Sequence, residues 1–174
     1  MKILKFQLLF CLLILVLNAP AENLIFNGSF EAGSGGFALE RHQRPDTNPE
    51  LKFLPLTTDA VIRRQGRKAL KIENPFQEYY ILHCKDFPLD EKSSYRFSAW
   101  VRSERETSLI FRFEFRHPSK EMNIVHRKFQ TGPEWRKLSL AFQTKNSGGT
   151  YLLRLIGEHS PGTLWVDDMT LCKE

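Results

Sequence analysis

Residues 109–116 of this chain, LIFRFEFR, alternate strictly between apolar and mostly charged side chains. One parity holds Leu109, Phe111, Phe113 and Phe115, and the other holds Ile110, Arg112, Glu114 and Arg116. A period of two places the two sets on opposite faces of a β-strand. The segment therefore predicts a strand with an aromatic face toward a core and a polar face outside.

Similar apolar runs recur through the rest of the sequence. They cover residues 69–73, 79–84, 95–103, 135–144, 150–158 and 163–171. Glycine and proline turn signals separate them, and no stretch has sustained helical periodicity. The 14 phenylalanines suit a core that is filled from two facing sheets. The pattern predicts one all-β domain, either a sandwich or a barrel.

The last apolar run changes parity half-way. Its apolar positions are Leu164 and Val166 before the change and Met169 and Leu171 after it. The change falls at Asp167-Asp168, where one extra residue in a β-bulge would turn the following side chains over. A buried carboxylate is costly without a partner, so we expect a cation or backbone donors beside these acids.

The first 21 residues read as a signal peptide. Lys2 and Lys5 precede an apolar run at 6–17, and Ala19-Pro20-Ala21 offers a small-x-small cleavage site. We expect cleavage near Ala21, export to the periplasm or the exterior, and a single mature domain at 22–174. The apolar run is too short to span a bilayer, and no later stretch predicts a span.

The net charge of the chain excludes few classes of function. Without Lys2 and Lys5 the formal charge falls from +5 to +3. The basic run RRQGRK at 63–68 brackets a turn glycine and has no aromatic side chain between its charges. We therefore favour a solvated hairpin loop over a nucleic-acid site.

Two cysteines remain after the predicted cleavage, Cys84 and Cys172. In an oxidising compartment they can form a disulfide that closes a long loop. The alternative is two buried thiols. The spacing leaves both possibilities open.

Five segments together resemble carbohydrate-binding modules of the family four/nine type. They are NLIFNGSFEAGSGGF, VIRRQGRKALKI, SYRFSAWVRS, EWRKLSLAFQT and LWVDDMTL, in family order from Asn23 to Leu171. The resemblance implies a galactose-binding-domain-like jelly roll, a β-sandwich of two antiparallel sheets. It also implies a module that binds sugar without cleaving it, is often attached to glycoside hydrolases, and carries a structural calcium between the chain ends.

The resemblance implies a calcium site built from both ends of the chain. By position, its ligands would be the Glu31 side chain, the Ser29 carbonyl, Lys68 or Gln65 in the loop, and Asp168. Calcium prefers six to eight oxygen ligands of this kind. Arg64 and Gln65 stand where the family often has an acid, which weakens the site. The alternative is a solvated Glu31 and an Asp168 that accepts backbone N–H bonds.

The resemblance also implies a sugar site on an outer sheet face. The candidate residues are Arg112, Glu114, Arg116 and Arg154, with Glu158 beside them and Tyr79 or Tyr80 as a stacking ring. We expect Trp100, Trp135 and Trp165 to pack structurally. Such a charged face suits a decorated or acidic glycan. The alternative is a solvated, salt-bridged sheet face.

The sequence therefore predicts a secreted, monomeric, non-catalytic module for a poly- or oligosaccharide, which cooperates with secreted glycoside hydrolases. A second hypothesis is an adhesive or structural β-sandwich that binds protein. A third is hydrolysis of glycosyl bonds, although no carboxylate pair stands in a recognisable motif. The five histidines lack metal-ligand spacing.

Overall fold

The computed structural model describes residues 22–41, 53–54, 56–74, 80–116, 124–145, 149–158 and 161–174. The expected signal peptide at 1–21 lies outside these residues. The described part forms eleven strands: β1 (Ala38–Arg41), β2 (Phe53–Leu54), β3 (Thr57–Asp59), β4 (Ala69–Asn74), β5 (Tyr80–Phe87), β6 (Ser94–Ser103), β7 (Thr107–Arg116), β8 (Ile124–Thr131), β9 (Arg136–Gln143), β10 (Thr150–Gly157) and β11 (Gly162–Lys173). It contains no helix that could cross a membrane.

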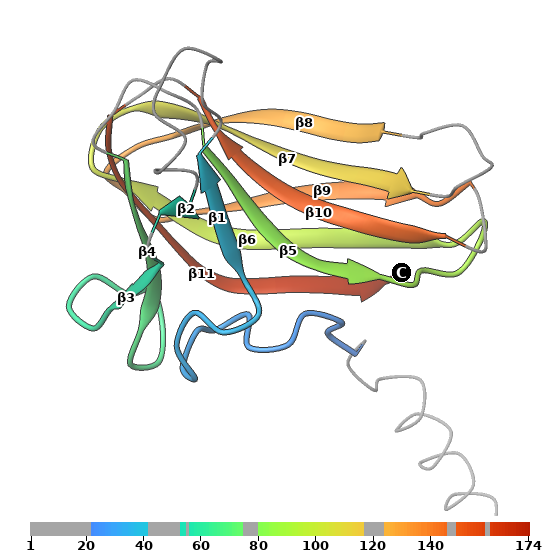
Figure 1. Ribbon diagram of the computed structural model, residues 1–174, viewed down its shortest axis with the longest axis horizontal. Helices are drawn as coiled ribbons and strands as arrows, with labels where there is room; N and C mark the ends of the chain where they lie inside the picture. The colour runs from blue at the N-terminus through green and yellow to red at the C-terminus, as the bar shows by residue number, and fades with distance from the viewer. Residues whose placement is uncertain are drawn as a thin grey trace, which may run out of the picture.

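The strands form two facing antiparallel sheets (Figure 1). The six-stranded sheet has the order β2-β1-β5-β10-β7-β8, and the five-stranded sheet has the order β3-β4-β11-β6-β9. This arrangement confirms the predicted β-sandwich and excludes the closed barrel. The sequence patterns did not predict β1, β2, β3 or β8.

An aromatic core fills the space between the sheets. Phe97 of β6 contacts Phe111 of β7 at 4.7 Å between ring centroids, and Phe113 of β7 lies 4.3 Å from Phe142 of β9. Leu109, Phe111, Phe113 and Phe115 are all buried. The aromatic face predicted for 109–116 is therefore confirmed, and its other face is the outer surface of the six-stranded sheet.

The predicted bulge is present in β11. The register between β11 and β6 shifts between Asp167 and Thr170, and Asp168 adopts a positive φ of 47°. Before the bulge β11 pairs with β4, and after it the N-terminal segment runs alongside. There the Leu24 N–H donates to the Leu171 carbonyl at 2.8 Å, and the Met169 N–H donates to the Gly28 carbonyl at 2.9 Å. The two ends of the described chain are thus held together.

Candidate functional site

Three arginines surround one glutamate on the outer face of the six-stranded sheet. Arg154 Nη1 of β10 lies 2.8 Å from Glu114 Oε2 of β7, and Arg112 Nη2 lies 3.2 Å from the same oxygen. Arg116 Nε lies 3.2 Å from Glu114 Oε1. We call Arg112, Arg116 and Arg154 around Glu114 the arginine cluster. The structure brings these four predicted residues together, with a local formal charge of +2.

Glu114 is buried although it belongs to the outer face, with only 5% of its surface exposed. The guanidinium groups cover it and remain accessible to different extents, since 53% of the Arg116 side chain is exposed, 30% of Arg112 and 16% of Arg154. Desolvation lowers the pKa of Arg154, with Arg116 and Arg112 acting in the same direction and Glu114 and Glu40 opposing them. The positive charge is therefore only partly compensated.

Residues of the neighbouring strands extend this face on both sides of the arginine cluster. Arg154 pairs with Arg112 on one side and with His83 of β5 on the other, and Arg112 pairs with His126 of β8. His83 Nε2 lies 2.9 Å from Glu40 Oε2 of β1. The amino-acid sequence does not reveal these two histidines as neighbours of the cluster, because only the strand pairing places them in its row.

A row of isoleucines runs beside the arginine cluster. Ile156 of β10 pairs with Ile110 of β7 and with Ile81 of β5, and all three are half-buried at outward-facing positions. The described outward positions of β5, β7, β8 and β10 carry no Phe, Tyr or Trp side chain. The face therefore offers hydrogen-bond donors and an aliphatic strip.

Tyr80 does not supply a stacking ring on this face. It is 5% exposed and lies against Gly157 of β10, where an added Cβ would come 2.2 Å from the Tyr80 ring. Its parity in β5 turns it toward the core with Leu82. Burial also raises the pKa of its hydroxyl. The other candidate, Tyr79, lies outside the described residues.

Two tryptophans of the five-stranded sheet are covered by neighbours. Trp165 is buried and donates through Nε1 to Asp59 Oδ2 at 3.0 Å. The Arg64 guanidinium carbon lies 4.3 Å from the centre of the Trp100 ring. These contacts agree with structural packing and leave neither ring as a flat open platform. Trp135 is half-buried in the turn before β9.

The basic loop at 63–68 is held by backbone hydrogen bonds to Glu31. Glu31 Oε1 accepts the N–H groups of Arg67 at 2.7 Å and Lys68 at 3.1 Å. These bonds hold the pKa of Glu31 below its ordinary value. Gly66 leaves room for the carboxylate, because a Cβ there would come 2.3 Å from Glu31 Oε1.

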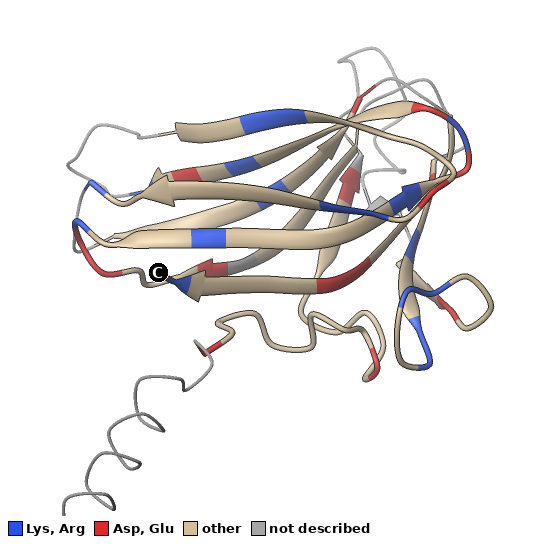
Figure 2. Cartoon of the chain, turned by 180° about the vertical axis from the view of Figure 1, so that it is seen from behind, with Lys and Arg blue, Asp and Glu red and all other residues tan. Residues whose placement is uncertain are grey.

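Basic and acidic positions are interspersed over strands and loops (Figure 2).

Asp167 holds the other side of the same loop. Its Oδ2 accepts the N–H groups of Arg64 at 3.0 Å and Gln65 at 3.2 Å, and its Oδ1 accepts the Asp168 N–H at 2.8 Å. The carboxylate is fully buried. Desolvation raises its pKa, while the three N–H donors oppose that rise. The backbone donors expected at the bulge are thus present, and they donate to the carboxylate of Asp167.

The residues expected to bind calcium fit that ion poorly. Glu31 uses one oxygen for two N–H donors, and its Oε2 lies 3.8 Å from Arg67 Nε. The loop presents N–H groups to these carboxylates, whereas calcium needs oxygen ligands. Among the described residues, no three Asp, Glu, His or Cys side chains gather into a metal cluster. Ser29 is exposed and Asp168 is half-buried. The calcium site stays a prediction.

The two cysteines are not joined by a disulfide. Cys84 is buried on β5 of the six-stranded sheet, and Cys172 lies on β11 of the other sheet, next to the inward-facing Leu171. Because side chains alternate along a strand, Cys172 points to the outer side of its sheet and away from Cys84. This placement does not support the disulfide, and of the two cysteines Cys84 alone fits the buried thiol of the alternative.

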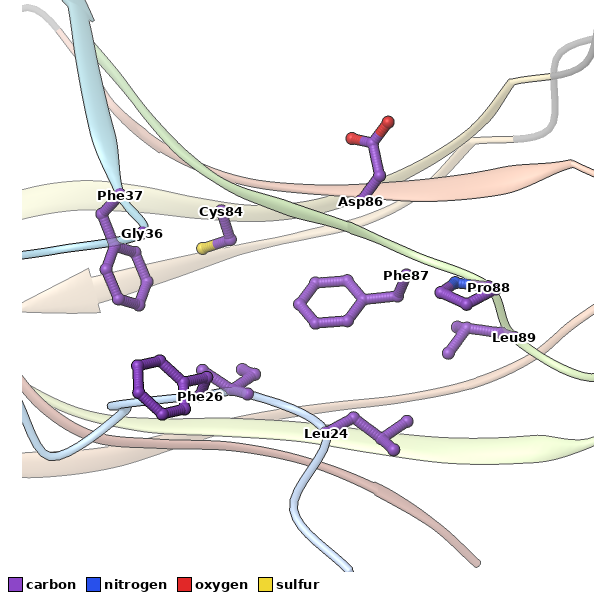
Figure 3. A pocket seen from close by; sticks show the side chains of 10 residues that line it. Leu24, Phe26, Gly36, Phe37, Cys84, Asp86, Phe87, Pro88 and Leu89 are labelled. Atoms are coloured by element: carbon purple, nitrogen blue, oxygen red, sulfur yellow. The ribbon is translucent and has the colours of Figure 1, made fainter.

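An apolar pocket of about 240 Å³ opens between the N-terminal segment and the end of β5 (Figure 3). Phe26, Phe37, Cys84 and Phe87 contribute to its wall, and Phe26 is 77% exposed. Burial raises the pKa of the Cys84 thiol, so it is not a reactive thiolate. The pocket has few polar groups to bond sugar hydroxyls, so we do not assign it to glycan binding.

The sequence of this sandwich can be compared with known families. A family model described as a carbohydrate binding domain matches residues 22–161. The chain belongs to this family. The resemblance to family four/nine modules is thereby confirmed. None of the curated proteins matches this carbohydrate-binding domain.

Solved structures share the fold at low sequence identity. A family 16 carbohydrate-binding module has a TM-score of 0.63 and 18% identity, over 86% of this chain and 99% of that one. A family 61 module, solved with β-1,4-galactotriose, has a TM-score of 0.63 and 14% identity, over 88% and 100%. A tailspike protein of bacteriophage CBA120 has a TM-score of 0.71 and 9% identity, over 87% of this chain but 21% of the tailspike domain. These similarities establish the fold of the carbohydrate-binding domain.

Proposed function

We propose that this carbohydrate-binding domain is a non-catalytic module that binds a poly- or oligosaccharide on the outer face of its six-stranded sheet. The arginine cluster is the observation that carries the proposal. It places many N–H donors beside an aliphatic strip on an open sheet face, and sugars present hydroxyl groups and apolar C–H faces together. Family membership supports the same ligand class.

The site of action that we propose lies outside the cytoplasm. The predicted leader supports export, and sequencing the N-terminus of the purified protein tests cleavage near Ala21. The family's usual attachment to glycoside hydrolases supports a role beside secreted hydrolases, in which this chain holds the polysaccharide and a separate enzyme cleaves it.

Affinity electrophoresis against soluble polysaccharides tests the function. The panel should include β-1,4-galactan, because a similar structure was solved with β-1,4-galactotriose. We expect retarded migration in at least one polysaccharide, and an unchanged mobility in all of them would reject the proposal. A parallel screen on chromogenic glycosides should show no hydrolysis.

One observation favours a second function, adhesion to another protein through the same face. The described outward positions of β5, β7, β8 and β10 lack the aromatic rings on which sugars stack, and Tyr80 is buried. If no polysaccharide retards the protein, a structural or adhesive sandwich becomes the better account.

A further inference from the structure

We infer that the glycan bound on this face carries anionic groups, either carboxylates or sulfate esters, and that the arginine cluster binds them. This inference rests on the proposed function and names the chemical class of its ligand. It starts from the balance of charge within the cluster, where three guanidinium groups share a single carboxylate.

The cluster has more donors than its carboxylate can accept. Each arginine contacts Glu114 through one nitrogen, although a guanidinium group has five N–H donors. Within the described part of the chain, Nε of Arg112 and Nε of Arg154 are buried and have no hydrogen-bond partner. Native proteins leave few such donors unpaired, so Glu114 alone does not satisfy the cluster. Both Nε atoms are covered, and the donors that an anion can reach are the remaining Nη groups of the more exposed Arg112 and Arg116.

The nearby acids are already paired with other groups. Glu158 forms an ion pair with Lys128, and Glu40 lies against His83. In the described ion pairs the cluster contacts Glu114 alone, and Glu40 acts on Arg154 only as a more distant charge. A carboxylate or sulfate ester supplies planar or clustered oxygens with negative charge, which guanidinium groups bind through paired N–H donors.

Exposure indicates where the anion binds. Arg116 and Arg112 are the more accessible members, and they flank Glu114 along β7. An acidic group between their free N–H donors would place the adjoining sugar ring near the isoleucine row of β10 and β7. The low exposure of Arg154 suits it to holding Glu114 in position rather than to contacting the glycan.

Titration calorimetry with matched ligands tests the inference. Oligogalacturonate is compared with its methyl ester, which has the same backbone without the charge, and dextran sulfate is compared with dextran. Tighter binding of oligogalacturonate than of its ester identifies a carboxylate, and tighter binding of dextran sulfate than of dextran identifies a sulfate ester. Either result supports the inference, and we expect affinity to fall as ionic strength rises.

A matched pair of variants locates the site. Arg116→Gln should weaken binding of the charged ligand at least tenfold. Arg96→Gln is the control, because Arg96 is also 53% exposed and also contacts a glutamate through Nε, but lies on β6 of the other sheet. It should leave the affinity unchanged. Equal losses in both variants would indicate general charge attraction and overturn the inference.

The remaining outcomes separate this inference from the proposed function. If neutral polysaccharides bind and charge on the ligand gives no advantage, the anionic ligand is wrong and the carbohydrate-binding function stands. If neither the neutral panel nor the charged ligands bind, both are wrong. Melting curves of the two variants should match that of the parent chain, which establishes that each variant is folded.

Discussion

The buried carboxylate of Asp167 accepts the backbone N–H of Arg64, which lies 103 positions earlier, at 3.0 Å. This bond and its neighbour from Gln65 fix the basic loop against the bulge of β11. A charged acceptor in a buried position makes stronger hydrogen bonds than a neutral one.

Replacing this carboxylate should destabilise the domain. In Asp167→Asn one oxygen becomes an NH₂ group, which faces backbone N–H donors and leaves them unpaired. We expect the free energy of unfolding to fall by about 2 kcal/mol. Urea denaturation measures it. Asp86→Asn, at an exposed carboxylate of β5, should change it by about 0.5 kcal/mol or less.

Glu31 should make the free energy of unfolding depend on pH in the acid range. Because its pKa is lowered in the folded state, its contribution is fully present above its ordinary value of 4.5 and is lost as pH falls through the folded value. In Glu31→Gln this loss should be absent, so the stabilities of parent and variant converge below that range. A constant difference from pH 7 to pH 3 would contradict the role of the charge. Asp167 has the opposite effect on the free energy of unfolding. Because its pKa is raised in the folded state, its contribution is fully present below its ordinary value of 3.8 and is lost as pH rises through the folded value.

Glu114 should be required for stability as well as for the shape of the face. Glu114→Gln leaves three guanidinium groups around a buried neutral amide, and we expect a loss of about 3 kcal/mol in the free energy of unfolding. Glu174→Gln removes the carboxylate of the exposed Arg96 pair and should cost about 0.5 kcal/mol or less. Similar losses in both variants would show that the burial of Glu114 does not increase the cost of removing its charge.

Calcium removal tests the metal that the family resemblance implies. The hydrogen bonds of Glu31 and Asp167 to loop N–H groups lead us to expect the same melting midpoint with and without chelator. An ion that binds only the native state would raise the midpoint. A midpoint that falls in chelator and recovers with added calcium would therefore show that the ion occupies this part of the fold.

The sequence predicted those parts of the fold that depend on side-chain alternation. Leu109, Phe111, Phe113 and Phe115 face the core, and the parity change at Asp167-Asp168 marked the bulge correctly. The short strands β1, β2 and β3 were missed because two to four residues give no period. The strand β8 was missed because its outward face includes the apolar Ile124 and its inward face includes Arg127, so neither parity is uniform.

The site was only partly predictable. Alternation placed Arg112, Glu114 and Arg116 on one face, but their meeting with Arg154 depends on the register between β7 and β10. In YYILHC both parities are apolar, so the orientation of Tyr80 could not be decided from the sequence. At Glu31 the sequence identified the right loop, but a backbone can present either carbonyl or N–H groups, and only the fold shows which.

The most direct test of the central proposal is chemical-shift mapping of the isotope-labelled domain with the polysaccharide that retards it most. We expect the backbone amides of Arg112, Glu114, Arg116 and Arg154 to shift on titration, while those of β6 and β9 stay in place. Shifts confined to the five-stranded sheet, or no shift with any glycan, would contradict glycan binding on the six-stranded sheet.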